Sequence, residues 1–171
     1  ALQEQLGQAI RNSQTELREL EILRDASGPM LARFSEEFDH LLSSPKIVDV
    51  RLDDKALQIF TELLFCVDPR TGLRHEIGKF RIDIPICSKE PGNIRWHNLT
   101  RRVSGHKEGM HAPHVFPDGH GCLGNAAEPL AEMLGNYEYS SAASLCILFI
   151  ESVNVNDNAG VRINNWPVAK P

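Results

Sequence analysis

Apolar side chains recur at steps of three and four residues along the first part of the chain. Between residues 2 and 24 they form one stripe, made of Leu2, Leu6, Ile10, Leu17, Leu20 and Leu23. This spacing predicts an amphipathic helix over 2–24, and Gly28-Pro29 is expected to end it. A second helix is predicted over 30–42, where Leu31, Phe34, Phe38, Leu41 and Leu42 share a face.

Beyond Pro45 the apolar period changes to two, which is the period of a β-strand. Two strands are predicted over 47–50 and 56–67, because a polar break at 53–55 has the composition of a turn. The segment therefore predicts a β-hairpin.

The same period continues after a turn predicted at 68–72. A third strand is predicted over 80–86, with Pro85 near its end because proline cannot donate to a strand ladder. A fourth strand is predicted over 94–99. Together with the hairpin, these strands predict a four-stranded antiparallel meander.

Regular patterning stops between residues 103 and 125, a segment dense in Gly, Pro and His. Loops of this length are uncommon in compact domains unless they carry function. Periodicity returns over 140–153, where apolar residues on nearly every side predict a buried helix. The tail after it has Trp166-Pro167 as its expected anchor. The fold class predicted is α+β, with a helical extension over 1–28 and one domain over 29–171.

Composition and charge narrow the range of partners. The chain has 171 residues, of which 42% are hydrophobic and 24% charged, and its net charge is −5. This charge argues against nucleic acid as the main ligand, and the small basic cluster of Arg101, Arg102 and Lys107 is interpreted as a solvated loop. The longest apolar run, 145–150, is far too short to span a membrane. We expect a cytoplasmic protein without a membrane partner.

Cys122 is the best candidate nucleophile among the four cysteines. It lies in the irregular loop, whereas Cys66, Cys87 and Cys146 lie at strand ends or in a helix, where buried apolar groups are expected. Because no two cysteines are spaced as C-x-x-C, neither a zinc ribbon nor a secreted disulfide scaffold is indicated.

The loop segment carries a resemblance to a known family. It reads Ala112-Pro113-His114-Val115-Phe116-Pro117-Asp118-Gly119-His120-Gly121-Cys122-Leu123. This resembles the active-site signature of ubiquitin-conjugating enzymes, which runs His-Pro-Asn, an aliphatic, an aromatic, two residues, Gly, two residues and Cys-Leu. Two positions depart, because Ala112 replaces the signature's His and His114 its Asn. The resemblance extends over residues 30–160. Within the family, the chain is similar to divergent members from bacterial ubiquitin-like operons that are associated with antiphage defence.

The resemblance implies a UBC-like fold and a reaction. Cys122 is expected to accept a ubiquitin-like protein as a thioester from an activating enzyme and to pass it to a lysine of a target protein, without a cofactor or metal. His114 is expected to stabilise the oxyanion or to accept the lysine proton. Supporting roles in the loop fall to Pro113, Asp118, Gly119 and His120.

Three further interpretations remain open at this stage. The fold type also occurs in binding modules of the UBC and RWD classes that lack catalysis. A zinc site built from His106, His111, His114, His120 and Cys122 has suitable ligand types. The 2–24 helix is expected to pack on its own domain, to self-associate or to hold a partner.

Overall fold

The computed structural model describes residues 2–86, 88–103, 109–153 and 162–170. The chain forms two structural units, residues 1–37 and 38–171. The boundary lies inside the first helix, α1 (Leu2–Ser43). Cys87, His106, Lys107 and the predicted polar turn after 153 lie outside the described residues.

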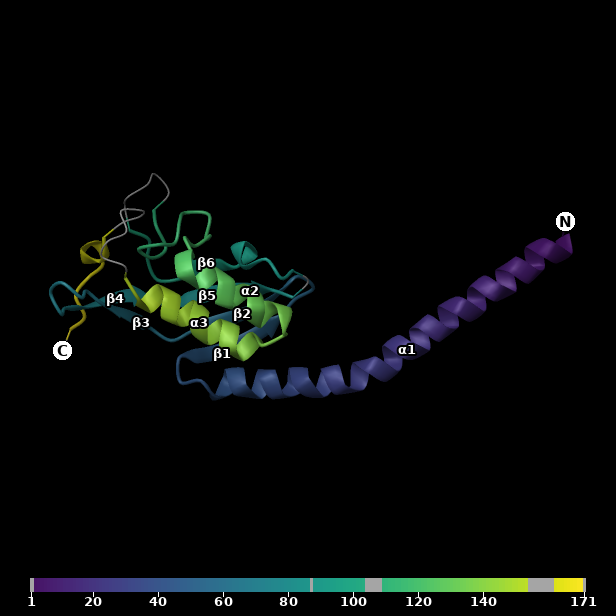
Figure 1. Ribbon diagram of the computed structural model, residues 1–171. Helices are drawn as coiled ribbons and strands as arrows, with labels where there is room; N and C mark the ends of the chain where they lie inside the picture. Colours follow the sequence, from purple (N-terminus) through teal and green to yellow (C-terminus); the bar gives the residue numbers. More distant parts are fainter. Residues whose placement is uncertain (1, 87, 104–108, 154–161, 171) are drawn as a thin grey trace. The chain divides into compact units, whose positions relative to one another are not determined.

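Helix α1 corrects the prediction of two separate helices, because it continues through Gly28-Pro29 (Figure 1). A proline inside a helix removes one backbone donor and clashes with the preceding turn, which weakens the helix without always ending it. Gly28 has no Cβ, so part of the clash that proline imposes on the residue before it is absent. No helix in the part of the chain described here is long and apolar enough to cross a membrane.

Most of the described apolar side chains of the stripes predicted on α1 are exposed. They are Leu6, Ile10, Leu17 and Phe34 in the first unit and Phe38 and Leu42 in the second, whereas Leu41 of the second unit is buried. The side chains of Leu2, Leu20, Leu23 and Leu31 lie outside the described part. Leu41 therefore ties the last turn of α1 to the core of the second unit.

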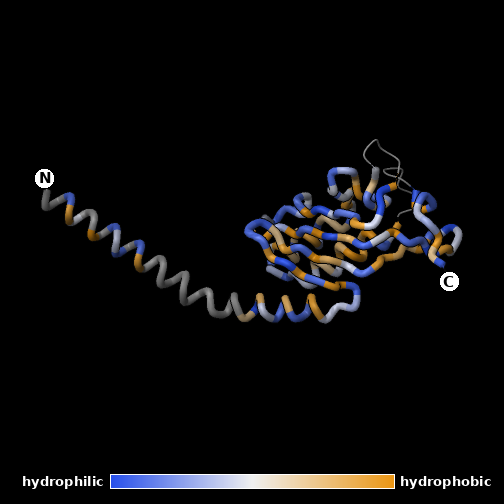
Figure 2. The backbone as a smooth tube through the Cα atoms, turned by 180° about the vertical axis from the view of Figure 1, so that it is seen from behind, coloured by the Kyte–Doolittle hydropathy of each residue, from blue (hydrophilic) through white to orange (hydrophobic). Residues whose placement is uncertain are grey.

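The second unit contains the predicted four-stranded antiparallel meander. Its strands follow the order β1 (Ile47–Leu52), β2 (Ala56–Thr61), β5 (Phe80–Pro85) and β6 (Arg95–Asn98). Ile59 pairs with Ile82, which in turn pairs with Trp96, and all three side chains are buried. Hydrophobic and hydrophilic residues alternate along these strands (Figure 2), as expected for a sheet with one buried face.

The long second strand predicted over 56–67 is instead two strands. After Thr61 the chain leaves the sheet, and β3 (Leu64–Val67) pairs with β4 (Arg74–Gly78) in a separate two-stranded sheet. Strand β4 is not predicted from the sequence, because a polar residue, His75, occupies one of its buried positions. Its Nδ1 lies 2.7 Å from the carbonyl oxygen of Trp166, which gives the buried ring a partner.

The C-terminal tail is anchored where the sequence predicts. Trp166 is buried, and the backbone N–H of Glu76 donates to the carbonyl oxygen of Pro167. The N–H of Ala169 donates in turn to the carbonyl oxygen of Arg74. The tail therefore continues the small sheet beside β4.

Helices α2 (Ala127–Gly135) and α3 (Tyr139–Glu151) lie over the buried face of the strands (Figure 1). The indole N–H of Trp96 donates to the carbonyl oxygen of Cys146, which fixes β6 against α3. Helix α2 was not predicted, although Leu130 and Leu134 place a short apolar stripe on it. Single helical turns at Pro91–Asn93, Gly124–Ala126 and Ile163–Asn165 complete the unit.

Helix α3 matches the predicted helix in position, but it is not buried on every side. Ala142, Cys146 and Ile150 face the core, whereas Leu148 is 58% exposed. Leu145 and Phe149 are partly buried beside it. One face of α3 is thus apolar and open, and it borders the loop that carries Cys122.

Candidate functional site

The loop that carries Cys122 is attached to the outer edge of the meander. Strand β6 is an edge strand, and such strands present unpaired backbone groups. Here the N–H of Trp96 donates to the carbonyl oxygen of Gly119 at 2.8 Å, and the N–H of Asn98 donates to Nδ1 of His111 at 2.8 Å. The loop therefore satisfies the edge of the sheet, and the sheet holds the loop in place.

His111 and Asn98 form a buried polar centre that the sequence analysis did not identify as one. Asn98 donates through its side-chain amide to the carbonyl oxygens of Ile77 and His111. Nε2 of His111 lies 3.2 Å from the carbonyl oxygen of Pro117. Burial lowers the pKa of His111 to about 4, so the ring is neutral near pH 7 and fits its role as an acceptor from Asn98.

Residues 114–122 form a short hairpin within the loop. The N–H of Phe116 donates to the carbonyl oxygen of His120, and the N–H of Cys122 donates to that of His114, both at 2.9 Å. Gly119 closes the turn with φ +85°, a conformation that other residues rarely adopt. Pro113 is buried at the start of the hairpin. The predicted supporting residues Pro113 and Gly119 thus both belong to the loop's framework.

Gly121 brings the hairpin close to the core. A Cβ at this position would lie 2.9 Å from Cε1 of Phe149 and 3.1 Å from Cζ3 of Trp96. The rings of Trp96 and Phe149 pack on each other with centroids 5.2 Å apart. The absence of a side chain at Gly121 therefore allows the residue before Cys122 to rest on these two rings.

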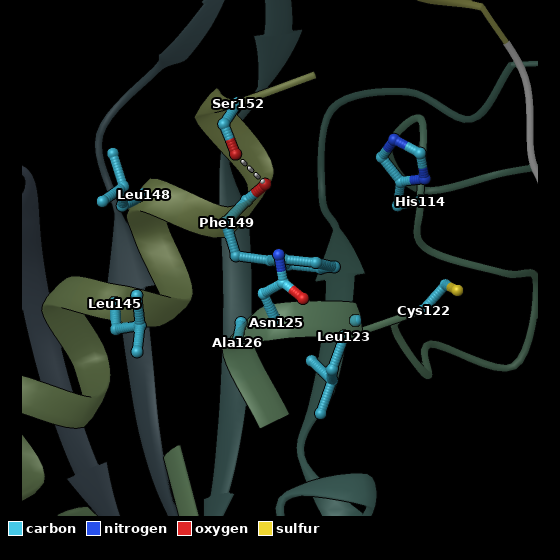
Figure 3. Close-up of a pocket in the computed structure, with 10 residues that line it drawn as sticks. His114, Cys122, Leu123, Asn125, Ala126, Leu145, Leu148, Phe149 and Ser152 are labelled. Atoms are coloured by element: carbon cyan, nitrogen blue, oxygen red, sulfur yellow. Dashed lines mark hydrogen bonds between the residues drawn. The ribbon is translucent and has the colours of Figure 1, made fainter. Parts of the chain in front are cut away.

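Cys122 is exposed and lines a hollow of about 270 Å³ between the loop and α3 (Figure 3). His114 lies on the loop side with Cys122, and Leu145 and Leu148 lie on the opposite side, on α3. The remaining lining residues are Leu123, Gly124, Asn125, Ala126, Phe149 and Ser152. The hollow thus combines one thiol, one imidazole and an apolar wall.

The other described cysteines differ from Cys122. Cys66 and Cys146 are buried. Burial raises the pKa of the Cys66 thiol to about 12 and raises that of Cys146 as well. Since the thiolate is the nucleophile, burial disfavours both of these cysteines as nucleophiles, and Cys122 is the exposed cysteine of the described residues.

His114 and Cys122 line the same hollow, but the ring nitrogens of His114 are not open to solvent. Both of its nitrogens are buried, although the residue lines the same hollow as the thiol. A donor role toward a bound carbonyl oxygen therefore requires the His114 ring to turn toward the hollow.

Asp118 and His120 form a pair at the tip of the hairpin. Nδ1 of His120 is bonded to Oδ1 of Asp118, and the His120 ring stacks on Phe116 with centroids 4.7 Å apart. Desolvation raises the pKa of the Asp118 carboxyl, but the backbone N–H and the ring of His120 outweigh it and hold this pKa below its usual value. Asp118 therefore carries a negative charge near pH 7.

The residues of the α3 wall are functional candidates that the sequence analysis missed. Leu145, Leu148 and Phe149 were assigned to a buried helix, because a run of apolar residues does not reveal which side is covered. The signal that separates the sides is Ser144, a polar residue one turn before Leu148.

The zinc interpretation finds little support in the described residues. Among them, no three His, Cys, Asp or Glu side chains are grouped to hold a metal ion. Both ring nitrogens of His111 lie at hydrogen-bond distance from the protein's own backbone. His106 belongs to the part that is not described.

Comparisons with known proteins identify no relative of this chain. No protein-family model, no curated protein and no solved structure matches the chain. The established result is thus an α+β protein whose second unit holds an exposed cysteine on a firmly attached loop, beside an apolar hollow.

Proposed function

We propose that this chain is a conjugating enzyme of the ubiquitin type, which carries a ubiquitin-like protein as a thioester on Cys122. The order of its elements supports the proposal: a helix, a four-stranded antiparallel meander with the β3–β4 hairpin inserted between its second and third strands, a loop with the cysteine, and further helices. The same order and the signature-like spacing of residues 112–123 together motivate the assignment of a UBC-like fold.

The observation that carries the proposal is the setting of Cys122. Its thiol is exposed, while its backbone N–H donates to the carbonyl oxygen of His114 and the preceding residue, Gly121, packs on Trp96 and Phe149. A carrier cysteine must meet two large partners in turn, so it needs an accessible thiol on a rigid support. The apolar wall of α3 offers a surface for the chain end of the carried protein.

The reaction proceeds through two acyl transfers. The Cys122 thiolate attacks the carbonyl carbon of the thioester held by an activating enzyme, a new C–S bond forms, and the activating enzyme's thiol leaves. A lysine amine of the target then attacks the same carbon, and the Cys122 thiolate leaves. In both steps the carbonyl oxygen gains negative charge, and the His114 ring lines the hollow where a donor to that oxygen is needed.

The partners in this proposal are proteins: a ubiquitin-like protein, its activating enzyme and targets with accessible lysines. The setting that fits such a pathway is the cytoplasm, where ATP drives the activating step, and the sequence resemblance suggests antiphage defence in a bacterium. Neither a cofactor nor nucleic acid takes part.

The test uses ubiquitin-like proteins that are each already charged on their own activating enzyme. Wild-type protein is mixed with each of them, and the products are separated on non-reducing and reducing gels. We expect a thiol-sensitive adduct with wild type, a thiol-resistant ester or no adduct with Cys122→Ser, and no adduct with Cys122→Ala. Ser141→Ala, an exposed position of α3 outside the hollow, serves as the matched control. The absence of an adduct with every charged partner would favour a non-catalytic binding module.

The role of His114 is tested on a preformed thioester. His114→Asn replaces the imidazole N–H with an amide N–H donor, and we expect it to retain most of the rate of discharge to lysine. His114→Ala removes the donor, and loss of one such donor typically costs about 10²–10³ in rate. Equal rates for wild type and both variants would remove the His114 side chain from the mechanism.

A further inference from the structure

The second histidine of the hairpin, His120, is placed differently from His114. Its side chain is 45% exposed, whereas both ring nitrogens of His114 are buried. Two contacts hold the His120 ring: the stack on Phe116 and the bond from Nδ1 to the Asp118 carboxylate. His120 is thus an oriented imidazole that solvent and substrates can reach.

His120 and Cys122 lie on the same side of the hairpin. Residues 120–122 pair with residues 114–116 in an antiparallel bridge centred on Val115 and Gly121. In such an extended segment, alternate residues point to the same side. Because the Cα–H of Gly121 faces Trp96 and Phe149, the side chains of His120 and Cys122 point away from these rings.

The bond to Asp118 decides which ring nitrogen can act as a base. An ionised carboxylate only accepts hydrogen bonds, so Nδ1 of His120 carries the proton in the neutral ring. Nε2 then holds the lone pair. This is the arrangement in which a carboxylate orients a histidine and stabilises the charged ring once it has taken up a proton.

We propose that His120, oriented by Asp118, is the base that accepts the proton of the attacking lysine amine. This assignment rests on the proposed thioester function of Cys122. In the step, the amine nitrogen forms a bond to the thioester carbon, the C–S bond to Cys122 breaks, and the thiolate leaves. The proton lost by the nitrogen passes to Nε2 of His120, and water later removes it. His114 is left with the task of stabilising the oxyanion.

Other ionisable groups lie close to this pair and belong in any interpretation of its pH dependence. Arg95 and His97 of β6 both approach the turn at Gly119. His97 is paired with Asp83, at 3.2 Å between Nε2 and Oδ2, and Asp83 is also held by Arg81. Asp118 is the acidic partner bonded to the His120 ring.

The experiment loads Cys122 without an activating enzyme. A synthetic peptide whose C-terminal glycine is a mercaptoethanesulfonate thioester is exchanged onto the full-length protein, and the purified adduct is discharged with free lysine or with hydroxylamine. Hydroxylamine is already unprotonated at neutral pH and depends less on a base. The variants are His120→Gln, His120→Ala and Asp118→Asn, with His40→Gln as the matched control, since His40 is an exposed histidine of α1.

We expect His120→Gln to lower the rate of lysine discharge about 10²-fold, the lower end of the usual effect of a general base, and to leave hydroxylamine discharge within about twofold of wild type. Asp118→Asn keeps an oxygen that can accept the His120 backbone N–H. A lower rate of lysine discharge in this variant should therefore come from the loss of the carboxylate's negative charge. His120→Ala should regain lysine discharge when imidazole is added. His40→Gln should match wild type.

The possible outcomes separate the two proposals. Failure of the peptide to attach to Cys122 speaks against the thioester function itself. Normal attachment with unchanged lysine discharge in His120→Gln overturns the role of His120. An equal fall in the lysine and hydroxylamine rates, with no imidazole rescue, also overturns it, because a base should affect the two nucleophiles differently.

Discussion

The backbone N–H of Cys122 donates a hydrogen bond of 2.9 Å to the carbonyl oxygen of His114. The two residues that the sequence singles out for chemistry are therefore joined through the main chain, across a hairpin of nine residues, 114–122. Because this bond involves no side chain, it survives substitution of either residue. Effects of His114 or Cys122 variants can thus be attributed to the imidazole or the thiol.

The cysteines of the described residues should differ sharply in reactivity. We expect brief treatment of the native protein with iodoacetamide to alkylate Cys122 and to leave Cys66 and Cys146 unmodified, because both are buried and burial raises their pKa values. Mass spectrometry of the tryptic peptides, with a urea-unfolded sample as the control, measures this. Labelling of Cys66 as fast as Cys122 in the native protein would contradict the described burial.

Gly121 should tolerate no side chain. A Cβ there would approach Phe149 to 2.9 Å, and overpacking of this kind typically costs about 1–3 kcal/mol. We predict that Gly121→Ala lowers the free energy of unfolding by that amount, measured by urea denaturation. Gly92→Ala is the matched control, because nothing lies within 4 Å of its Cβ position. Equal midpoints for the two variants would show that the hairpin does not rest on Trp96 and Phe149 as described.

The free energy of unfolding should decrease as the pH is lowered, because His111 is buried as a neutral ring. Its folded-state pKa, about 4, lies below the ordinary value of 6.5, so the unfolded chain binds the proton more readily. The stabilisation is fully present above about pH 6.5 and is lost as the pH falls towards 4, by about 2 kcal/mol at pH 4.5.

This pH dependence is isolated by a variant that cannot titrate. His111→Asn retains an oxygen acceptor for the N–H of Asn98, and we expect its unfolding free energy to vary less between pH 7 and pH 4.5 than that of wild type. Urea titrations at the two pH values supply the comparison. The same loss in both proteins would mean that His111 is not the group responsible.

The α3 wall should matter for the carried protein more than for stability. Leu148 is 58% exposed, so Leu148→Asp should change the free energy of unfolding by no more than about 0.5 kcal/mol. If Leu148 contacts the carried protein, loss of that apolar contact costs about 1.5–3 kcal/mol, so we predict that the rate of thioester formation falls at least tenfold. Ser144→Asp adds the same charge one turn earlier and lies outside the hollow. A reduction of the same size in both variants would point to charge alone.

The sequence predicts the parts of this fold that have clean periodicity. The meander and the position of α3 follow from apolar residues at regular steps. Strand β4 was missed because His75 takes a buried position and finds its partner in Trp166, far away in the chain. Helix α1 was divided wrongly because local rules weigh Pro29 heavily, whereas a helix can continue past one missing donor.

The candidate site likewise has features that the sequence predicts and features that depend on contacts between distant residues. Cys122 is identifiable as a candidate from its place in an irregular loop, and the structure shows it exposed. The bond between His111 and Asn98 is not predictable, because a buried histidine and a surface histidine look alike in a sequence. The open face of α3 is equally hidden, since only the packing of the sheet decides which apolar side of a helix is covered.

The central claim is tested most directly by the intact mass of the protein after incubation with a ubiquitin-like protein charged on its activating enzyme. The account predicts a mass increase equal to the ubiquitin-like protein less one water, lost again on treatment with hydroxylamine and mapped to the peptide that contains Cys122. An increase that maps to another residue, or no increase while the activating enzyme is demonstrably charged, would contradict it.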